Sequence, residues 1–469
     1  MGSSVFDAPV SRRGFLKAGA GVAALAGAAP LLSACGSSGG SSSDTLNVAL
    51  FGTQQAADQL QKVVTPLFNK VHPGVKVRFN ATNGTDWNDF FGKLLTQIAG
   101  GARPDVAAIA TEGLQLFADK GLAQPLDDYV KRDAADLKGY FADVHPALVE
   151  AMMYQGHLFE LPTDWNAGNM FYSTELFAKA GIDAPSPTWT RDDFESIARK
   201  IKKADPGAVG YDWVVRLWGS WTSWMYANNA NLLTEGKWDG GDWMWSTFYQ
   251  GDPAASGRKG GWKWGDPTAN SPGTVEALQY MIDLKHMGLS PSPDVGGGGT
   301  LQGLFASGKI GMSIAGGFWA GGLANAGMKP GSFDVNFFPK WQSQRHLFGT
   351  GGYGIFAKSS KKDLAWEFVK AMTAPTGLNA LFPGTATTLP RKSMMTAQRY
   401  APTGPKHWQV FYDTLTEHPD TAPIPAPPYY NALATALNQR TTQAMSSGDA
   451  KSALDGLQSD LETAAKSSH

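Results

Sequence analysis

After residue 44, short apolar runs alternate with segments in which apolar residues recur at helical spacing. Thr45–Phe51 and Val106–Ala110 are apolar enough to predict strands, and Val75–Phe79 alternates apolar and polar positions as a further strand. Leu60–Phe68 and Phe90–Ile98 place apolar residues three or four positions apart, which predicts amphipathic helices. This order of strands and helices predicts an α/β fold in which helices cover a mostly parallel sheet.

Two other segments have distinct local patterns. Thr190, followed by Asp192 and Asp193, is a good N-terminal cap and predicts that a helix begins there. The stretch from Gly236 to Asp266 is rich in Trp, Gly and Asp and has little periodicity, so we expect an extended surface insertion, in the part of the chain that is assigned to lobe 2 below and with no assigned role.

The first residues carry an export signal rather than a folded element. Arg12-Arg13 followed by Phe-Leu-Lys matches the twin-arginine export signal, and an Ala/Gly-rich apolar stretch then leads to Leu-Ser-Ala-Cys35, which resembles a lipobox. We expect residues 1–34 to be a signal peptide, Cys35 to be lipidated, and 35–44 to be a flexible linker. A membrane-spanning helix over 18–34 is the alternative, but that stretch is short and mostly Ala and Gly.

Several short motifs occur in an order that is typical of one family. They include Gly100–Val106, Gly121–Asp128, Tyr154–Pro162, Met170–Gly181 and Phe305–Ile314. Together they resemble the family 1 extracellular solute-binding proteins, such as the maltose- and glycerol-phosphate-binding receptors. The resemblance implies a two-lobed periplasmic-binding-protein fold, type II-like, in which each lobe is a mixed sheet flanked by helices and crossing segments form the hinge.

The same resemblance implies that both lobes are discontinuous in sequence. We expect lobe 1 at about 45–163 and 335–373, and lobe 2 at about 164–334 and 374–469.

Composition argues against several classes of partner and cofactor. A net charge of −1 gives no reason to expect nucleic acid. The eight histidines are scattered without metal-ligand spacing, and Cys35 is the single cysteine, so neither a metal nor a cofactor is expected. Some of the 16 tryptophans lie among Gly, Asp and Asn, as expected of platforms for the apolar faces of sugar rings, although core packing accounts for most of them.

Motifs for catalysis are weak throughout. No local pattern selects a pair of carboxylates, as a glycoside hydrolase would need. Gly311–Ala315 misses the last glycine of a nucleophile elbow. Gly352–Ala357 fits a loose dinucleotide pattern but has strand character. We therefore expect no catalytic residue and no enzyme activity, and a secreted glycoside hydrolase remains an alternative of another class.

Candidate ligand-binding residues fall in two groups. Asp164, Trp165 and Asn166 lie at the first interlobe crossing, where the resemblance implies polar contacts to sugar hydroxyls. Strand-to-helix loops supply Gln54, Gln55 and Glu112, because ligands gather at the carboxyl edge of an α/β sheet.

Further candidates are aromatic residues or lie beside glycines. The resemblance implies an aromatic wall at Phe318 and Trp319, and glycines near Tyr353 could bring backbone amides close to the ligand. Trp221 is preferred within a trio at three-residue spacing, although core packing explains that trio equally well. The full set of candidates is Gln54, Gln55, Glu112, Asp164, Trp165, Asn166, Trp221, Phe318, Trp319, Gly352, Tyr353 and Tyr429.

These features predict an extracytoplasmic receptor of an ABC importer, lipid-anchored at the outer face of the cytoplasmic membrane and monomeric. It would bind a mono- to oligosaccharide between its lobes, close around it, and present it to the permease subunits. The sequence is also compatible with a receptor for glycerophosphodiesters or another phosphorylated solute, and with a structural lipoprotein. We expect replacement of Trp165 or Trp319 with Ala to weaken sugar binding and leave the fold intact.

Overall fold

The computed structural model describes residues 45–295 and 298–467. The predicted export signal, the lipidation site Cys35 and the linker therefore lie outside the described residues. Within that part of the chain, no helix is long and apolar enough to cross a bilayer.

The larger of the two main sheets has six strands and confirms the predicted α/β class. Its strand order is β16-β15-β3-β1-β2, and β6 also pairs with β15. Strands β2 and β3 both pair in parallel with β1, whereas β15 runs antiparallel to β3 and β6. The strands are β1 (Thr45–Phe51), β2 (Lys76–Thr82), β3 (Val106–Ala110), β6 (Pro162–Ala167), β15 (Leu347–Ile355) and β16 (Ala422–Pro423).

Helices cover this sheet at the predicted places. The helix expected over Leu60–Phe68 is the second half of α1, and that over Phe90–Ile98 lies within α2. Apolar faces of both helices bury residues such as Val64 and Phe90 against the strands. The covering helices are α1 (Gln54–Phe68), α2 (Trp87–Ala99), α3 (Thr111–Asp119), α14 (Lys362–Thr373) and α15 (Pro375–Leu381).

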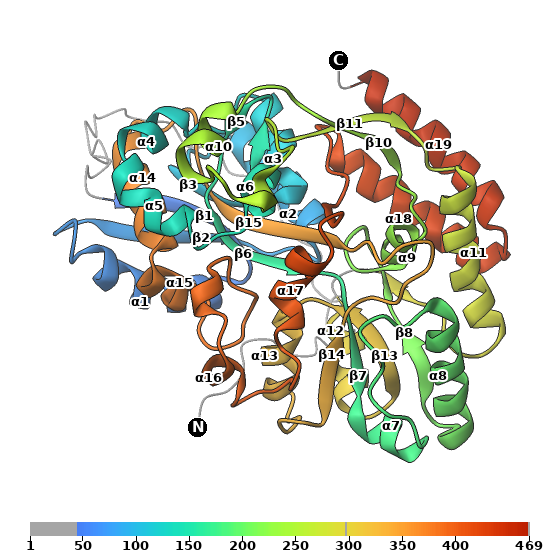
Figure 1. Ribbon diagram of the computed structural model, residues 1–469. Coiled ribbons are helices and arrows are strands. Elements are labelled where there is room, and N and C mark those ends of the chain that lie inside the picture. The colour runs from blue at the N-terminus through green and yellow to red at the C-terminus, as the bar shows by residue number, and fades with distance from the viewer. Residues whose placement is uncertain (1–44, 296–297, 468–469) are drawn as a thin grey trace, which may run out of the picture.

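A second sheet of four strands lies below the larger one in Figure 1. Its order is β14-β7-β13-β8, from β7 (Asn169–Ser173), β8 (Val209–Asp212), β13 (Ile310–Ala315) and β14 (Phe333–Asn336). Helix α8 (Arg191–Ala204) packs beside it and begins at the predicted cap, where Thr190 and Asp193 form a reciprocal capping box. The other helices beside this sheet are α7 (Thr174–Lys179), α12 (Gly299–Ala306) and α13 (Phe318–Asn325).

The chain crosses between the two sheets more than once. It leaves the larger sheet at Ala167 and enters the smaller one at Asn169, and it returns between Asn336 and Leu347. β16 belongs to the larger sheet although it falls within 374–469, the segment that we assigned to lobe 2. The exact lobe boundaries stay a prediction.

Three long helices lie together at the right of Figure 1: α11 (Pro272–His286), α18 (Tyr430–Ser447) and α19 (Ala450–Ser467). Helix α18 also contacts α2 beside the larger sheet, where Asn88 Nδ2 donates to Thr435 Oγ1 at 3.3 Å. The remaining elements are α4 (Asp127–Arg132), α5 (Ala134–Phe141), α6 (Pro146–Ala151), β4 (Met153–Tyr154), β5 (His157–Leu158), β9 (Val214–Val215), α9 (Trp221–Ala227), β12 (Asp294–Val295), η2 (Lys392–Met394), α16 (Ala397–Tyr400) and α17 (Val410–Glu417).

Residues 233–267, which we call the bridging segment, are more ordered than their sequence indicates. The segment contains the antiparallel pair β10 (Leu233–Lys237) and β11 (Trp262–Pro267), with α10 (Asp242–Phe248) and η1 (Pro253–Ala255) between them. It follows α9, but it packs on α5 and α6, which precede the first crossing: the Phe248 and Phe141 ring centroids are 4.2 Å apart. The expectation of a mere surface insertion is thus incomplete, because the segment joins distant parts of the chain.

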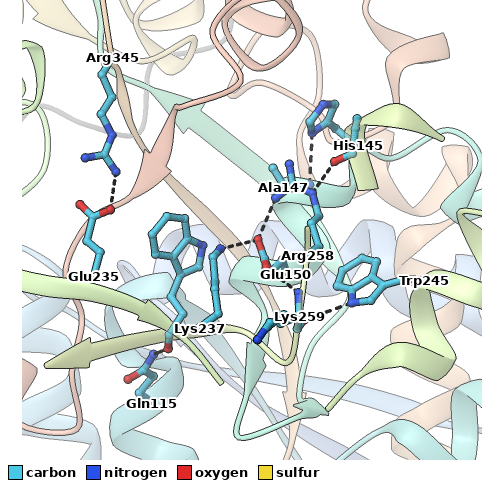
Figure 2. A network of polar contacts seen from close by, with 12 residues as sticks. Gln115, His145, Ala147, Glu150, Glu235, Lys237, Trp245, Arg258, Lys259 and Arg345 are labelled. Atoms are coloured by element: carbon cyan, nitrogen blue, oxygen red, sulfur yellow. Dashed lines mark hydrogen bonds and ion pairs between the residues drawn. The ribbon is translucent and has the colours of Figure 1, made fainter. Parts of the chain in front are cut away.

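One buried carboxylate anchors the bridging segment, as Figure 2 shows. Glu150 of α6 is fully buried and accepts hydrogen bonds from Lys237 Nζ at 2.6 Å, Arg258 Nη1 at 2.8 Å and the Lys259 backbone N–H at 3.0 Å. Every one of these donors comes from the bridging segment. A buried charge with this many donors is well compensated.

Candidate functional site

A cavity of about 510 Å³ lies at the carboxyl end of strands β1 and β3, beside the crossing strand β6. Strands of the larger sheet, the segment that follows β9, and helices α13 and α18 contribute to it. The residues that line it are Phe51, Thr85, Asp86, Trp87, Ala110, Glu112, Asp164, Asn166, Arg216, Leu217, Trp218, Phe318, Gly349, Thr350, Gly351, Phe382, Ala386, Thr387, Tyr430, Ala434 and Asn438.

Strand geometry decides which crossing residues face this cavity. Successive side chains of a strand point to opposite faces, so Asp164 and Asn166 of β6 reach the cavity together. Trp165 between them points away: it is fully buried and packs edge-on against Tyr412, with ring centroids 6.0 Å apart. The prediction that Trp165 binds the ligand is therefore not supported by its position, and its replacement by Ala is expected to disturb the core.

Glycines of β15 form the floor beside these side chains. Gly351 pairs with Asp164 and Gly349 with Asn166 in the antiparallel register. A Cβ at Gly351 would lie 2.6 Å from Asp164 Oδ1, and one at Gly349 would lie 3.3 Å from Trp218 Cδ1. Glycine at these two positions leaves the space that the cavity occupies.

Buried carboxylates are the main polar feature of the wall. Glu112, in the first turn of α3, is only 5% exposed, and its Oε2 has no hydrogen-bond partner in the part of the chain that the structure describes. Burial raises the pKa of Glu112 to about 7; the neighbouring Asp164 acts in the same direction and Arg216 acts against it. Burial likewise raises the pKa of Asp164 to about 6, although Thr387 Oγ1 donates to Asp164 Oδ2 at 3.2 Å.

Aromatic rings line the rest of the cavity. The Trp218 and Phe318 centroids are 5.7 Å apart, and those of Phe51 and Trp87 are 5.0 Å apart. All four rings are partly exposed, in contrast to the fully buried tryptophans of the core. Exposed ring faces next to carboxylates and amides suit a ligand with both C–H faces and hydroxyl groups.

Arg216 is the cationic side chain among the described lining residues. Its Nε donates to the Trp218 carbonyl at 2.7 Å, and its guanidinium carbon lies 5.4 Å from the centroid of the Trp218 ring. Burial lowers its pKa to about 10, while the charges of Asp86 and Glu112 oppose that shift. Residues 163–166 and 316–320 contain no basic side chain, so the motifs in those segments gave no sign of a cation at the site.

Of the predicted ligand-binding residues, four line the cavity: Glu112, Asp164, Asn166 and Phe318. Gln54 and Gln55 do not, because α1 begins at Gln54 and both side chains are exposed on its first turn. Tyr429 lines a separate surface groove of about 860 Å³ between α18, α19 and α3, whereas its neighbour Tyr430 reaches the cavity.

The other aromatic candidates belong to the core. Trp221 is fully buried on α9 and its Nε1 donates to Thr441 Oγ1 at 2.9 Å, so the member of its trio at the cavity is Trp218. Trp319 is 3% exposed and packs against Phe305 with centroids 5.2 Å apart, since the first turn of α13 directs Phe318 but not Trp319 to the cavity.

Gly352 and Tyr353 also lie away from the cavity. Tyr353 is 4% exposed and packs edge-on against Phe368 of α14, and Gly352 sits against Glu160 and the Leu161 carbonyl. Both residues are in the middle of β15, as their strand character predicted, and not at a strand-to-helix turn. The glycines near Tyr353 that do line the cavity floor are Gly349 and Gly351.

Several lining residues were missed by the sequence analysis: Phe51, Asp86, Trp87 and Arg216, and Trp218 was not the preferred member of its trio. A signal for two of them existed, because Asp86 and Trp87 follow the second strand as Gln54 follows the first. Within residues 45–295 and 298–467, no group of three His, Cys, Asp or Glu could hold a metal ion.

Comparisons with known proteins agree on one family. Residues 52–378 match the family model described as bacterial extracellular solute-binding protein. A putative binding protein of Brucella abortus is 25% identical over 308 residues, which are 65% of this chain and 66% of that protein. A maltotriose-binding protein of Pyrococcus abyssi is 23% identical over 295 residues, 61% of this chain and 54% of that protein. The chain thus aligns with less than two thirds of each relative's length.

Solved structures share the two-lobed fold. An ABC substrate-binding protein of Listeria monocytogenes, in complex with cycloalternan, has a TM-score of 0.71 at 21% identity, covering 90% of this chain and 99% of that one. The maltotriose-binding protein of Thermus thermophilus, bound with maltotriose, has a TM-score of 0.66 at 18% identity, with coverage of 90% and 99%. Identities this low establish the fold and leave the ligand open.

Proposed function

Since the chain belongs to the bacterial extracellular solute-binding protein family, we propose that it is the extracytoplasmic receptor of an ABC importer and binds a carbohydrate in the cavity described above. The observation that carries the proposal is the composition of the wall. Partly exposed rings of Trp218, Phe318 and Trp87 face the same space as Glu112, Asp164 and Asn166. Rings can cover the C–H faces of a sugar while carboxylates and amides bond its hydroxyls.

Closure between lobes is the second part of the proposal. The crossings at 167–169 and 336–347 would act as hinges between lobe 1 (about 45–163 and 335–373) and lobe 2 (about 164–334 and 374–469). A ligand that touches residues from both sides favours the closed form, because it gains contacts that the open form lacks. The permease would recognise that closed form.

A phosphorylated solute is the alternative that Arg216 could favour. Three carboxylates line the same cavity, however, and would repel a phosphate group. We therefore prefer a neutral or cationic ligand. We also propose that the protein releases its ligand unchanged and is not an enzyme, as its family membership suggests.

Location and assembly complete the proposal. Arg12-Arg13 and Cys35 would direct export and lipid anchoring, and the protein would act as a monomer beside its permease. Replacement of Cys35 with Ala should move the protein from the membrane fraction of the producing cells to the soluble fraction. Retention in the membrane fraction would argue against a lipid anchor at this cysteine.

The purified protein tests the function by a thermal-shift screen against mono-, di- and oligosaccharides and glycerophosphodiesters. A ligand that binds only the folded state raises the melting temperature in proportion to its affinity and concentration. We expect at least one carbohydrate to raise it and to be recovered unchanged after incubation. A shift with glycerophosphodiesters alone would overturn the carbohydrate assignment, hydrolysis would overturn the receptor, and no shift at all would overturn both.

A further inference from the structure

Negative charge predominates in the cavity wall. Asp86, Glu112 and Asp164 contribute carboxylates, and among the lining residues that the structure describes Arg216 is the single cation. Asp86 and Asp164 already accept hydrogen bonds from the chain itself: the Asp89 backbone N–H donates to Asp86 at 2.9 Å, and Thr387 donates to Asp164. Arg216 can offset one carboxylate but not all three.

Among these three carboxylates, Glu112 is the one with a buried oxygen that accepts no hydrogen bond from the described residues. Its Oε2 is buried and finds no donor in residues 45–295 and 298–467, and Glu112 is one of the residues that line the cavity. Burying a carboxylate without a donor is unfavourable, and protein interiors usually supply one. A donor delivered by the ligand would complete this site.

The Asp164 carboxylate lies against the same strand of glycines as Glu112. A Cβ at Gly349 would lie 3.9 Å from Glu112 Oε1, and a Cβ at Gly351 would lie 2.6 Å from Asp164 Oδ1. The two glycines are two positions apart on one strand face, a separation of about 7 Å. Glu112 and Asp164 therefore border the same glycine floor of the cavity.

Aromatic rings next to this floor also favour positive charge. Trp218 lies at Gly349, and Phe318 packs beside Trp218. The face of an aromatic ring attracts a cation, and tryptophan does so most strongly. Because no described group of three ligating side chains could hold a metal ion, an organic ammonium group fits this combination of rings and carboxylates better than a metal does.

From these contacts, and resting on the proposed function, we infer that the ligand is an amino sugar or a carbohydrate containing one, with its protonated amine between Glu112 and Asp164. The remaining wall, with Asn166, Thr350 and Asn438, would receive hydroxyl groups. The amine distinguishes this ligand from the neutral sugars that the same rings could hold.

Calorimetric titration of the purified protein with matched sugars tests the inference. The probes are glucose, galactose and mannose and their 1,4-linked disaccharides, each in a hydroxyl, 2-amino and 2-acetamido form. We expect the 2-amino form of at least one series to bind about tenfold more tightly than its hydroxyl form, as one added charged hydrogen bond would allow. In Glu112→Gln the two forms should bind within about twofold of each other, and Glu112→Asp, which keeps the charge, should restore part of the preference.

The outcomes separate this inference from the proposed function. Hydroxyl forms that bind as tightly as the amino forms overturn the inference and leave the carbohydrate receptor standing. An amino preference that survives in Glu112→Gln overturns the role of Glu112. Binding of no sugar in any series overturns the proposed function together with the inference.

Discussion

Two glutamates of this protein are buried to nearly the same degree but lie in contrasting surroundings. Glu150, beneath the bridging segment, accepts three hydrogen bonds, two of them from cationic side chains (Figure 2). Glu112, in the cavity wall, has an oxygen with no donor among the described residues. A buried carboxylate with all its donors serves the fold, whereas one with an open acceptor facing a cavity is available to a ligand.

The tryptophans divide in the same way. Trp165 is enclosed by other side chains, including Phe348 and Tyr412, whereas Trp218 keeps part of its ring exposed at the cavity. Exposed ring area next to polar groups therefore identifies the binding wall better than the number of tryptophans in a segment does.

Replacing Trp165 with Ala should give the largest effect on stability. Removing a fully buried Trp side chain leaves a cavity, so we expect the free energy of unfolding to fall by about 4 kcal/mol. Denaturant unfolding measures it, and Trp165→Phe, which keeps a ring, should lose much less. A Trp165→Ala protein of normal stability that no longer binds ligand would show that Trp165 belongs to the wall after all.

Replacing Glu150 with Gln should have the second largest effect on the free energy of unfolding. Lys237 and Arg258 would lose their anionic partner while their side chains are only 25% and 15% exposed. We expect the free energy of unfolding to fall by about 3 kcal/mol. Denaturant unfolding again measures the change.

An exposed ion pair of the same segment provides the control. Asp239 accepts from Lys259 at 2.9 Å but is 93% exposed, so Asp239→Asn should leave the unfolding curve unchanged. Equal effects of the two substitutions would mean that Glu150 does not anchor the bridging segment.

Replacing Glu112 with Gln should have a smaller effect that depends on pH. The raised pKa, from 4.5 to about 7, means that the folded protein holds a proton that the unfolded chain releases. Stability from this group is therefore complete below about pH 4.5, declines as pH rises, and reaches its minimum above about pH 7. At pH 6, in the absence of ligand, the free energy of unfolding of the wild type is about 2 kcal/mol lower than at low pH because of this group.

Unfolding measured from pH 4 to pH 8 checks the direction of this pH dependence. Glu112→Gln should match the wild type near pH 4 and become the more stable of the two toward pH 7. A constant difference between the two proteins across this range would mean that Glu112 is not buried as a carboxylate with an open acceptor.

Local signals in the sequence were enough to predict much of the fold. The bounds of β1 and β3 are those predicted, and α8 begins where Thr190 and Asp193 cap it. Periodicity and capping involve neighbours within a few residues, so they can be recognised without knowledge of the tertiary structure. The bridging segment lacks such a pattern, because its stability depends on contacts with Glu150 and other residues far along the chain.

The cavity wall was less predictable for a related reason. Asp164, Asn166, Glu112 and Phe318 could be located from their positions beside strands. Which neighbour faces the cavity depends on the side of a strand or helix, and Trp165 and Trp319, which the motifs indicated, are buried in the core instead of lining the cavity. Arg216 comes from a segment that only the folded chain brings to this wall.

The assignment of the cavity as the binding site is tested most directly by titrating Trp218→Ala with the carbohydrate that gives the largest thermal shift. Loss of a stacking ring should weaken binding at least about tenfold. Trp264→Ala is the matched control, because Trp264 is also partly exposed but stacks on Trp262 in the bridging segment. We predict that this control binds as the wild type does. Wild-type affinity in Trp218→Ala would contradict the assignment of this cavity as the ligand site.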